Sequence, residues 1–193
     1  MAQQEKNLRL RRTQKLLREA LIDLIEERGF DALTVGEITE RAMVSRAAFY
    51  RNYQDKYDLV ERIFEEAMAA LLNAVAELGT EHPPQIWVAF FEHIGQYERL
   101  YRTLLGGKGS PWFVRKMRTA LTELILKRGS LPHGPDMHSH HFSDSFIPDI
   151  VSTMFVEAII WWLEQGRPCT SREIAMRSAL LASALFKEAS TWQ

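Results

Sequence analysis

The sequence predicts an all-α protein, with a small N-terminal unit of three helices and a larger C-terminal helical bundle. Three observations lead to this prediction. Apolar residues recur with the 3.6-residue period of a helix along most of the chain, and no stretch alternates convincingly as a strand would. Start signals for helices also recur along it. Hydrophobic residues make up 46% of the 193 residues, which is enough for a sizeable core.

The first helix is expected over residues 7–28. Apolar residues form one stripe along it at i, i+3, i+4 and i+7 spacing, namely Leu17, Ala20, Leu21, Leu24 and Ile25. Gly29 follows, and glycine adopts the left-handed backbone that often ends a helix at little cost. The helix therefore has one buried face and a defined end.

Two short helices follow, over residues 34–41 and 45–52. Thr34 and Glu37 match a capping box, and Leu33 and Ile38 match the hydrophobic staple that accompanies it. Ser45 provides the next start, and Ala48 and Phe49 are expected to point inward. The tight turn Ala42-Met43-Val44 between the two helices gives the spacing of a helix-turn-helix.

The remaining helices are expected at about 55–78, up to Gln96, up to about Gly106, and at 111–127, 145–165 and 171–190. Asp55, Ser110 and Thr170 are the expected caps, and Glu173 completes a capping box with Thr170. The predicted domains are residues 1–57, the helix-turn-helix, and residues 58–193, a regulatory and dimerisation domain.

Composition and charge exclude several classes of protein. The 24 Lys+Arg nearly balance the 25 Asp+Glu, unlike a wholly basic coat protein or an acidic disordered chain. Residues 1–57 hold 11 basic against 9 acidic side chains, a slight excess where a polyanion could bind. Cys169 is the one cysteine, which fits a reducing compartment.

A cytoplasmic protein without a membrane span is expected. The N-terminus lacks the apolar segment of a signal peptide, and the apolar run Ile150–Leu163 is shorter than the roughly 18 residues of a spanning helix. No phosphate-binding glycine loop, nucleophile elbow or HExxH motif is present, so we expect neither an enzyme nor a bound cofactor.

The helix-turn-helix predicts binding to duplex DNA. The second helix of such a pair enters a major groove about 12 Å wide. Ser45 can cap this helix, Arg46 and Arg51 supply positive charge, and Tyr50 and Tyr53 supply rings with a hydrogen-bonding tip. Lys56, at the start of the next helix, can reach the phosphate backbone.

The run from Thr34 to Leu59 resembles the N-terminal signature of TetR-type transcriptional regulators. The matching positions are Thr34, Val44, Ser45, Tyr50, Tyr53, Lys56 and Leu59. The helix count also agrees, and the segment Trp161-Trp162-Leu163 resembles one C-terminal subtype. The resemblance implies that Thr34, Ser45, Tyr50 and Lys56 hold phosphates, whereas Arg46, Ala47 and Ala48 face base edges.

Arg46 is then the best candidate for reading a guanine, and Arg9, Arg11 and Arg12 could add contacts from the N-terminal arm. The chain departs from the family at two positions. It has Met43 in the turn where the family usually has glycine, and Thr39 where the family usually has alanine. A non-glycine residue in a left-handed turn costs about 1–2 kcal/mol.

The C-terminal domain is expected to pair two chains and to offer a place for a small-molecule effector. Its last two helices are apolar on more than one face, so each must pack against both its own core and a partner. Aromatic and methionine side chains are the candidates for an effector pocket: Trp87, Phe91, Tyr101, Trp112, Met117, Met154, Phe155 and Trp161.

The expected function is that of a repressor that a small-molecule effector releases from a palindromic operator. Two alternatives remain at this level. His138, His140 and His141, with His133, Asp136 and Asp144 nearby, could make the chain a metal-responsive regulator, although a surface loop without a metal is the default. A protein of the same fold could instead act as a coactivator or interaction module that binds a partner regulator.

Overall fold

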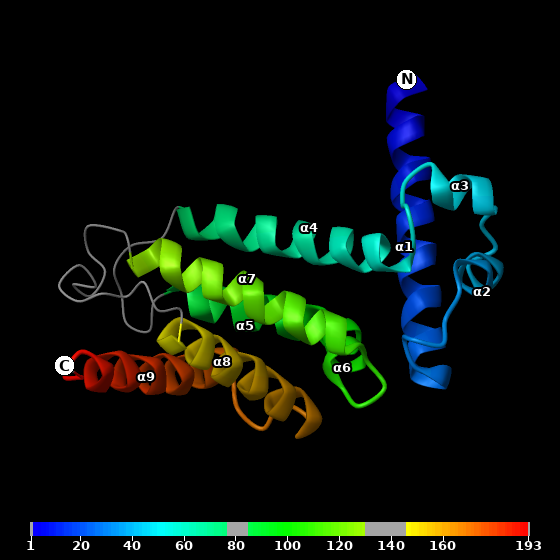
Figure 1. Cartoon of the computed structure of the whole chain (residues 1–193). Helices are drawn as coiled ribbons and strands as arrows, with labels where there is room; N and C mark the ends of the chain where they lie inside the picture. Colours follow the sequence, from blue (N-terminus) through cyan, green and yellow to red (C-terminus); the bar gives the residue numbers. More distant parts are fainter. Residues whose placement is uncertain (1, 77–84, 130–145, 193) are drawn as a thin grey trace. The chain divides into compact units, whose positions relative to one another are not determined.

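The computed structural model describes residues 2–76, 85–129 and 146–192 (Figure 1). Within these ranges none of the residues lies in a β-strand, and the prediction of an all-α fold is confirmed. The helices are α1 (Ala2–Arg28), α2 (Val35–Arg41), α3 (Arg46–Tyr50), α4 (Lys56–Ala76), α5 (Gln85–Gln96), α6 (Glu98–Leu105), α7 (Pro111–Gly129), α8 (Phe146–Glu164) and α9 (Ser171–Ala189).

The chain forms two compact units. Unit 1 contains Met1–Leu72 and Arg99–Ser110, and unit 2 contains Asn73–Glu98 and Pro111–Gln193. The boundary at residue 57 that the sequence suggested differs from this division, because most of α4 belongs to unit 1 and α6 returns to it. An amphipathic pattern reports only that a helix has a buried face, not which core that face joins.

Unit 1 has a core built on the predicted apolar stripe of α1. Leu17, Leu21 and Ile25 are fully buried, as are Ile38 of α2 and Phe49 of α3. Two ion pairs join the end of α1 to α2: Arg41 binds Glu27 with both guanidinium nitrogens at 2.7 and 2.8 Å, and Arg28 binds Glu37 at 2.7 Å. The pair of short helices is therefore fixed to α1 by packing and charge.

The ends of these helices follow the sequence signals. Glu37 N–H donates to the Thr34 hydroxyl at 3.3 Å, and the Glu37 carboxylate accepts from Thr34 N–H at 2.9 Å, which completes the predicted capping box. Thr170 and Glu173 form the same arrangement at the start of α9. Gly29 has φ +83°, the left-handed conformation expected after α1.

The segment Arg99–Ser110 is attached to α1 by polar contacts. Arg99 binds the carboxylates of Glu26 and Asp23, and Lys108 Nζ donates to the Glu26 carbonyl at 2.8 Å. Phe30 N–H donates to the Lys108 carbonyl at 3.0 Å. The hydrogen bonds from Arg99 lower the pKa of Glu26, so this contact is present at neutral pH and weakens as the carboxylate is protonated.

Unit 2 is a helical bundle in which α5 packs on α9, and α8 packs on both α7 and α9 (Figure 1). Its core is aromatic: Trp87 stacks on Phe155 with 4.2 Å between ring centroids, and Phe91 meets Trp162 edge-on at 5.6 Å. Between α7 and α8, the buried hydroxyl of Thr122 donates to Ser152 at 2.8 Å. The aromatic residues that the sequence offered as pocket lining therefore pack partly against one another.

Helix α8 is long and apolar enough to cross a membrane by length and composition alone. The apolar run Ile150–Leu163 was expected to be too short for a membrane span, whereas the helix extends over Phe146–Glu164. Half of the apolar part of the helix is buried inside the protein, and a helix in the core of a protein without membrane spans can be equally long and apolar. Its apolar character is explained by packing against α7 and α9.

Candidate nucleic-acid interface

The turn between α2 and α3 is tight and closes with backbone hydrogen bonds. Val44 N–H donates to the Thr39 carbonyl at 2.9 Å, and Met43 N–H donates to Glu40 at 3.0 Å. Met43 has φ +53°, so the left-handed position where relatives of the predicted family carry glycine is occupied here by a residue with a Cβ. Its side chain is 90% exposed and makes little packing contribution.

Met43→Gly is expected to stabilise the chain by up to about 1 kcal/mol. Removing the left-handed strain stabilises the folded chain by about 1–2 kcal/mol. The extra conformational freedom of glycine stabilises the unfolded chain by about 0.4–1 kcal/mol, which offsets part of this. Thermal and urea unfolding measure the change. Ala42→Gly is the matched control, because Ala42 has φ −74° and should lose stability; equal losses in both variants would contradict the strain argument.

Helix α3 presents a cationic and aromatic face to solvent. Arg46, Ala47 and Arg51 are exposed, and Tyr50 is 58% exposed, whereas Phe49 on the opposite side is fully buried. Among the described residues neither Arg46 nor Arg51 has an ion pair or a side-chain hydrogen bond. Their N–H donors are available for an acceptor outside the protein, such as a phosphate or a base edge.

The two predicted caps are in place beside this face. The Ser45 hydroxyl accepts from Ala48 N–H at 3.1 Å and remains exposed, while Ala48 itself is half-buried. The Thr34 hydroxyl is engaged with Glu37. Both hydroxyls therefore define where α2 and α3 begin. Ser45 still has its O–H donor for a further bond, whereas the O–H of Thr34 already donates to the Glu37 carboxylate at 2.8 Å.

Tyr53 and Lys56 lie differently from their predicted roles. Tyr53 is only 5% exposed, and its ring packs on Phe49 at 5.4 Å. Lys56 Nζ donates at 2.9 Å to each of three carbonyls, those of Phe30, Asp31 and Leu33.

These contacts use all three donors of the Lys56 ammonium, and burial lowers its pKa despite the nearby carboxylates. A phosphate would have to replace one of the carbonyls. Lys56 therefore stabilises the segment between α1 and α2 and is not open to a phosphate. Tyr53 is part of the core.

The residues predicted for an effector pocket are divided between the two units. Tyr101 belongs to unit 1 and the others to unit 2. Phe91, Met117 and Phe155 are fully buried, Trp87 nearly so, and Trp112 and Met154 half-buried, whereas Trp161 is 46% exposed. As placed, this set is largely packed core, so an effector there would have to separate side chains that now touch.

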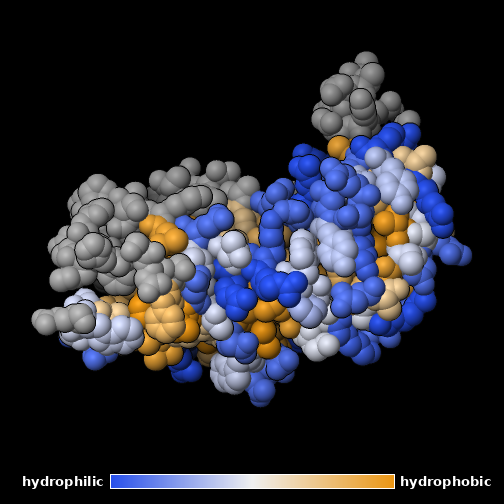
Figure 2. All heavy atoms as spheres, in the orientation of Figure 1, coloured by the Kyte–Doolittle hydropathy of each residue, from blue (hydrophilic) through white to orange (hydrophobic). Residues whose placement is uncertain are grey.

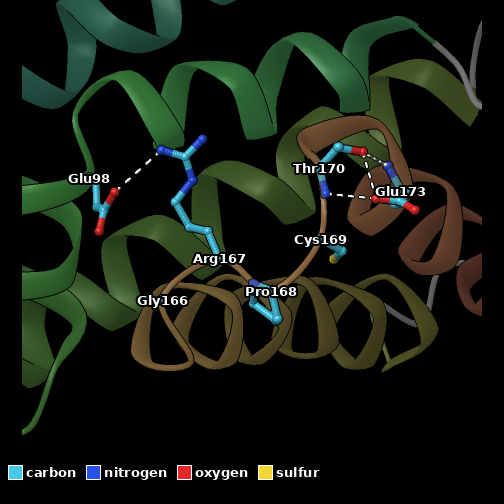
Figure 3. A pocket seen from close by; sticks show the side chains of 7 residues that line it. All are labelled: Glu98, Gly166, Arg167, Pro168, Cys169, Thr170 and Glu173. Atoms are coloured by element: carbon cyan, nitrogen blue, oxygen red, sulfur yellow. Dashed lines mark hydrogen bonds and ion pairs between the residues drawn. The ribbon is translucent and has the colours of Figure 1, made fainter.

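A surface hollow of about 580 Å³ lies elsewhere in unit 2 (Figure 3). It is lined by Glu98, Gly166, Arg167, Pro168, Cys169, Thr170 and Glu173. Figure 3 shows the Arg167 guanidinium turned toward Glu98, with 3.3 Å between Nη1 and the carboxylate. Arg167 also lies over the Trp162 ring, and the Trp162 indole N–H donates to the Cys169 carbonyl at 2.8 Å. These contacts fix the loop between α8 and α9.

The histidine-rich segment falls outside the described residues. His133, His138, His140 and His141, and with them Asp136 and Asp144, lie in 130–145. In the ranges that the structure does describe, no group of three or more potential metal ligands occurs. The metal-responsive alternative therefore stays a prediction.

One residue next to α3, the expected recognition helix, was not predicted from the sequence. Gly36, in α2, lies against the side chain of Arg46 so closely that an added Cβ would be 2.5 Å from Nη2. A glycine within a strongly capped seven-residue helix is a signal that could have drawn attention to it.

Comparison with known protein families identifies both parts of the chain. Residues 17–63 match the family described as "Bacterial regulatory proteins, tetR family", and residues 81–183 match "Transcriptional regulator C-terminal region". The second match alone covers more than half of the chain.

Solved structures show the same fold. A TetR transcriptional regulator from Streptococcus agalactiae 2603V superposes with a TM-score of 0.67 at 21% identity, over 93% of this chain and 98% of that one. A putative TetR-family regulator from Syntrophomonas wolfei gives 0.60 at 16% identity, over 90% and 94%.

Curated relatives match over only about a third of this chain. The HTH-type regulator YxbF of Bacillus subtilis is 34% identical over 70 residues, and the dhaKLM operon activator DhaS of Lactococcus lactis is 33% identical over 61. These matches span 34% and 32% of this chain, and 18% and 33% of the relatives, so their activities as whole proteins are not transferred by the match.

The geometry and the two matches agree on a helix-turn-helix followed by a helical regulatory domain, as the sequence predicted. The matched families are transcriptional regulators and not enzymes, which confirms the prediction of a non-enzymatic protein. The chain belongs to the TetR family of bacterial transcriptional regulators.

Proposed function

We propose that this protein is a cytoplasmic repressor that binds a palindromic DNA operator as a homodimer and is released by a small-molecule effector. The observation that carries the DNA-binding part is the outward face of α3, where Arg46, Tyr50 and Arg51 are exposed and the arginines have no partner among the described residues. In this proposal Ser45 and Thr34 contact phosphates, Thr34 after its O–H is released from Glu37, and Arg46, Ala47 and Ala48 face the bases.

The homodimer is proposed to form through α8 and α9. Leu180 and Leu181 of α9 are 66% and 58% exposed in the single chain, and Met176, Leu185, Ile150 and Trp161 are also exposed. Figure 2 shows hydrophobic atoms gathered over the part of unit 2 where α8 and α9 lie in Figure 1. We expect a second copy of the chain to cover this patch, because in a two-fold dimer the same surface of each subunit packs against its counterpart.

The effector is proposed to enter unit 2 among its aromatic side chains. Separating a stacked pair such as Trp87 and Phe155 would shift α5 against α8, the helices that carry them. Helix α4 runs without a break from unit 2 into unit 1, so a change in unit 2 has a continuous route to the recognition helix. A coupling free energy of about 1–3 kcal/mol would alter the affinity for the operator 5- to 150-fold.

We also propose that Trp161-Trp162-Leu163 marks a C-terminal subtype of the family. Trp162 and Leu163 are buried while Trp161 is exposed, so the segment serves both the core and the proposed partner surface. The match of residues 81–183 to a C-terminal regulator family is consistent with such a subtype.

The DNA-binding proposal is tested with an operator selected from random duplexes by the purified chain. Arg46→Ala combined with Tyr50→Ala is expected to weaken binding by about 30-fold or more, because a base contact is worth about 1–3 kcal/mol and a dimer loses two. Arg115→Ala, which removes an exposed arginine from α7, is the charge-matched control and should bind as the wild type does. Unchanged affinity in the double variant would refute the assignment of α3.

The direction of regulation is measured separately with a reporter gene behind the selected operator. Repression predicts that the intact chain lowers expression and that Arg46→Ala restores it. L. lactis DhaS is named as an activator, so the assay scores both directions. A chain that changes expression without binding DNA would favour the coactivator alternative.

A further inference from the structure

Gly36 has no conformational reason to be glycine. It lies in the first turn of α2, within a regular helix, and its φ is outside the left-handed range in which Gly29 and Gly166 are found. Glycine is among the poorest helix formers, and α2 has only seven residues over which to spread that cost. What distinguishes the position is a neighbour that needs the space.

That neighbour is the guanidinium of Arg46. A Cβ on Gly36 would lie 2.5 Å from Arg46 Nη2, 3.3 Å from Cζ and 3.6 Å from Nε. The Nη2 end of the guanidinium therefore lies in the space that a Cβ on Gly36 would fill. Arg46 is otherwise exposed and makes no ion pair or hydrogen bond with any described residue, so contact with α2 is what restricts its head.

We propose that Gly36 is a positioning residue for DNA recognition, and that it sets which base Arg46 reads. This inference rests on the proposed function, because it assumes that α3 meets the operator. A long side chain that is already held in one place loses less rotamer freedom on binding, and its fork of donors keeps one direction. Gly36 provides this by contact alone, without a hydrogen bond or ion pair from Arg46 to any described residue.

The test is Gly36→Ala, measured against a panel of operators with single-base changes. The clash falls on the far end of a flexible side chain, so the fold should accept alanine and the guanidinium should move. Thermal unfolding is expected at or above the wild-type temperature, because alanine is the better helix former. Discrimination at the base pair read by Arg46 is expected to fall at least fivefold, and discrimination elsewhere to stay within twofold.

A double-mutant cycle separates positioning from a general effect on the fold. Arg46→Ala should remove discrimination at the same base pair, and Gly36→Ala should then add less than a twofold change in that background. Arg46→Lys, which keeps the charge without the flat fork, should make the chain similarly insensitive to Gly36→Ala. Glu40→Gln, an exposed change on the same helix, is the control and should leave the discrimination profile as it is.

The outcomes distinguish this inference from the proposed function. If Arg46→Ala relaxes one base pair while Gly36→Ala leaves the profile unchanged, or changes it at other base pairs, the positioning role is overturned and the DNA interface stands. If neither Arg46→Ala nor Gly36→Ala affects binding to any duplex, the proposed interface itself is wrong.

Discussion

Phe49→Ala is expected to lower the free energy of unfolding of unit 1 by about 3–5 kcal/mol, the usual cost of removing a fully buried phenylalanine. The Phe49 ring is the buried side of α3 and meets the rings of Tyr50 and Tyr53 at 5.5 and 5.4 Å. A helix of five residues has almost no stability of its own, so this side chain holds the recognition helix to the unit.

Urea unfolding followed by circular dichroism measures the loss, and hydrogen exchange of the α3 amides assigns it to unit 1. Tyr50→Ala is the matched control, because it removes a neighbouring ring that is 58% exposed, and it should cost less than about 1 kcal/mol. Similar losses in the two variants would mean that α3 is not anchored through Phe49.

The second large effect is expected from Leu180→Glu combined with Leu181→Glu. In the proposed dimer each leucine is covered by the partner, and burying such a side chain contributes about 1.5–3 kcal/mol. Two glutamates in its place would leave unpaired charges in the interface. The chain should then be monomeric at 22.3 kDa in light scattering.

The operator affinity of this variant should fall about 10²–10⁴-fold, because two linked copies of unit 1 bind a two-part operator that much more tightly than one copy does. Binding to a single half-site should stay the same. Thr119→Glu, an exposed position on α7, adds negative charge to the same unit and should remain dimeric. A Leu180 and Leu181 variant that stays dimeric would place the interface elsewhere.

The helices and several of their ends were predictable because their causes are local. The predicted cap Ser110 was wrong, since its buried hydroxyl has no hydrogen-bond partner among the described residues. Thr34 with Glu37, and Thr170 with Glu173, form the hydrogen bonds that their spacing indicated, and Gly29 takes the left-handed conformation. The division into units was not predictable in this way. Arg99 binds Glu26 across more than seventy residues, and a contact at such separation leaves no periodic pattern in the sequence.

The site was predictable to the level of which helix faces outward. The family signature identified Ser45, Arg46 and Tyr50, and the structure leaves these exposed. It could not reveal that Lys56 donates to three carbonyls, because this depends on the course of the backbone between α1 and α2. It could not reveal that Tyr53 is buried either, because this depends on packing against Phe49. Gly36 was missed because a glycine within a capped helix signals that something lies close, but it does not indicate that the neighbour is a side chain ten positions away.

The return of Arg99–Ser110 to unit 1 has a consequence for how this chain folds and how it can be rearranged. Residues 73–98 belong to unit 2 and separate the two segments of unit 1. Unit 1 is therefore not one continuous stretch of sequence that can be excised or fused to another protein. Its completion must wait until that intervening stretch has been spanned, at the entropic cost of closing a loop. A fragment that ends within α4 would lack the contacts of Arg99 and Lys108 with α1. A longer segment in place of residues 73–98 would lower the stability of unit 1, because a longer loop costs more entropy to close.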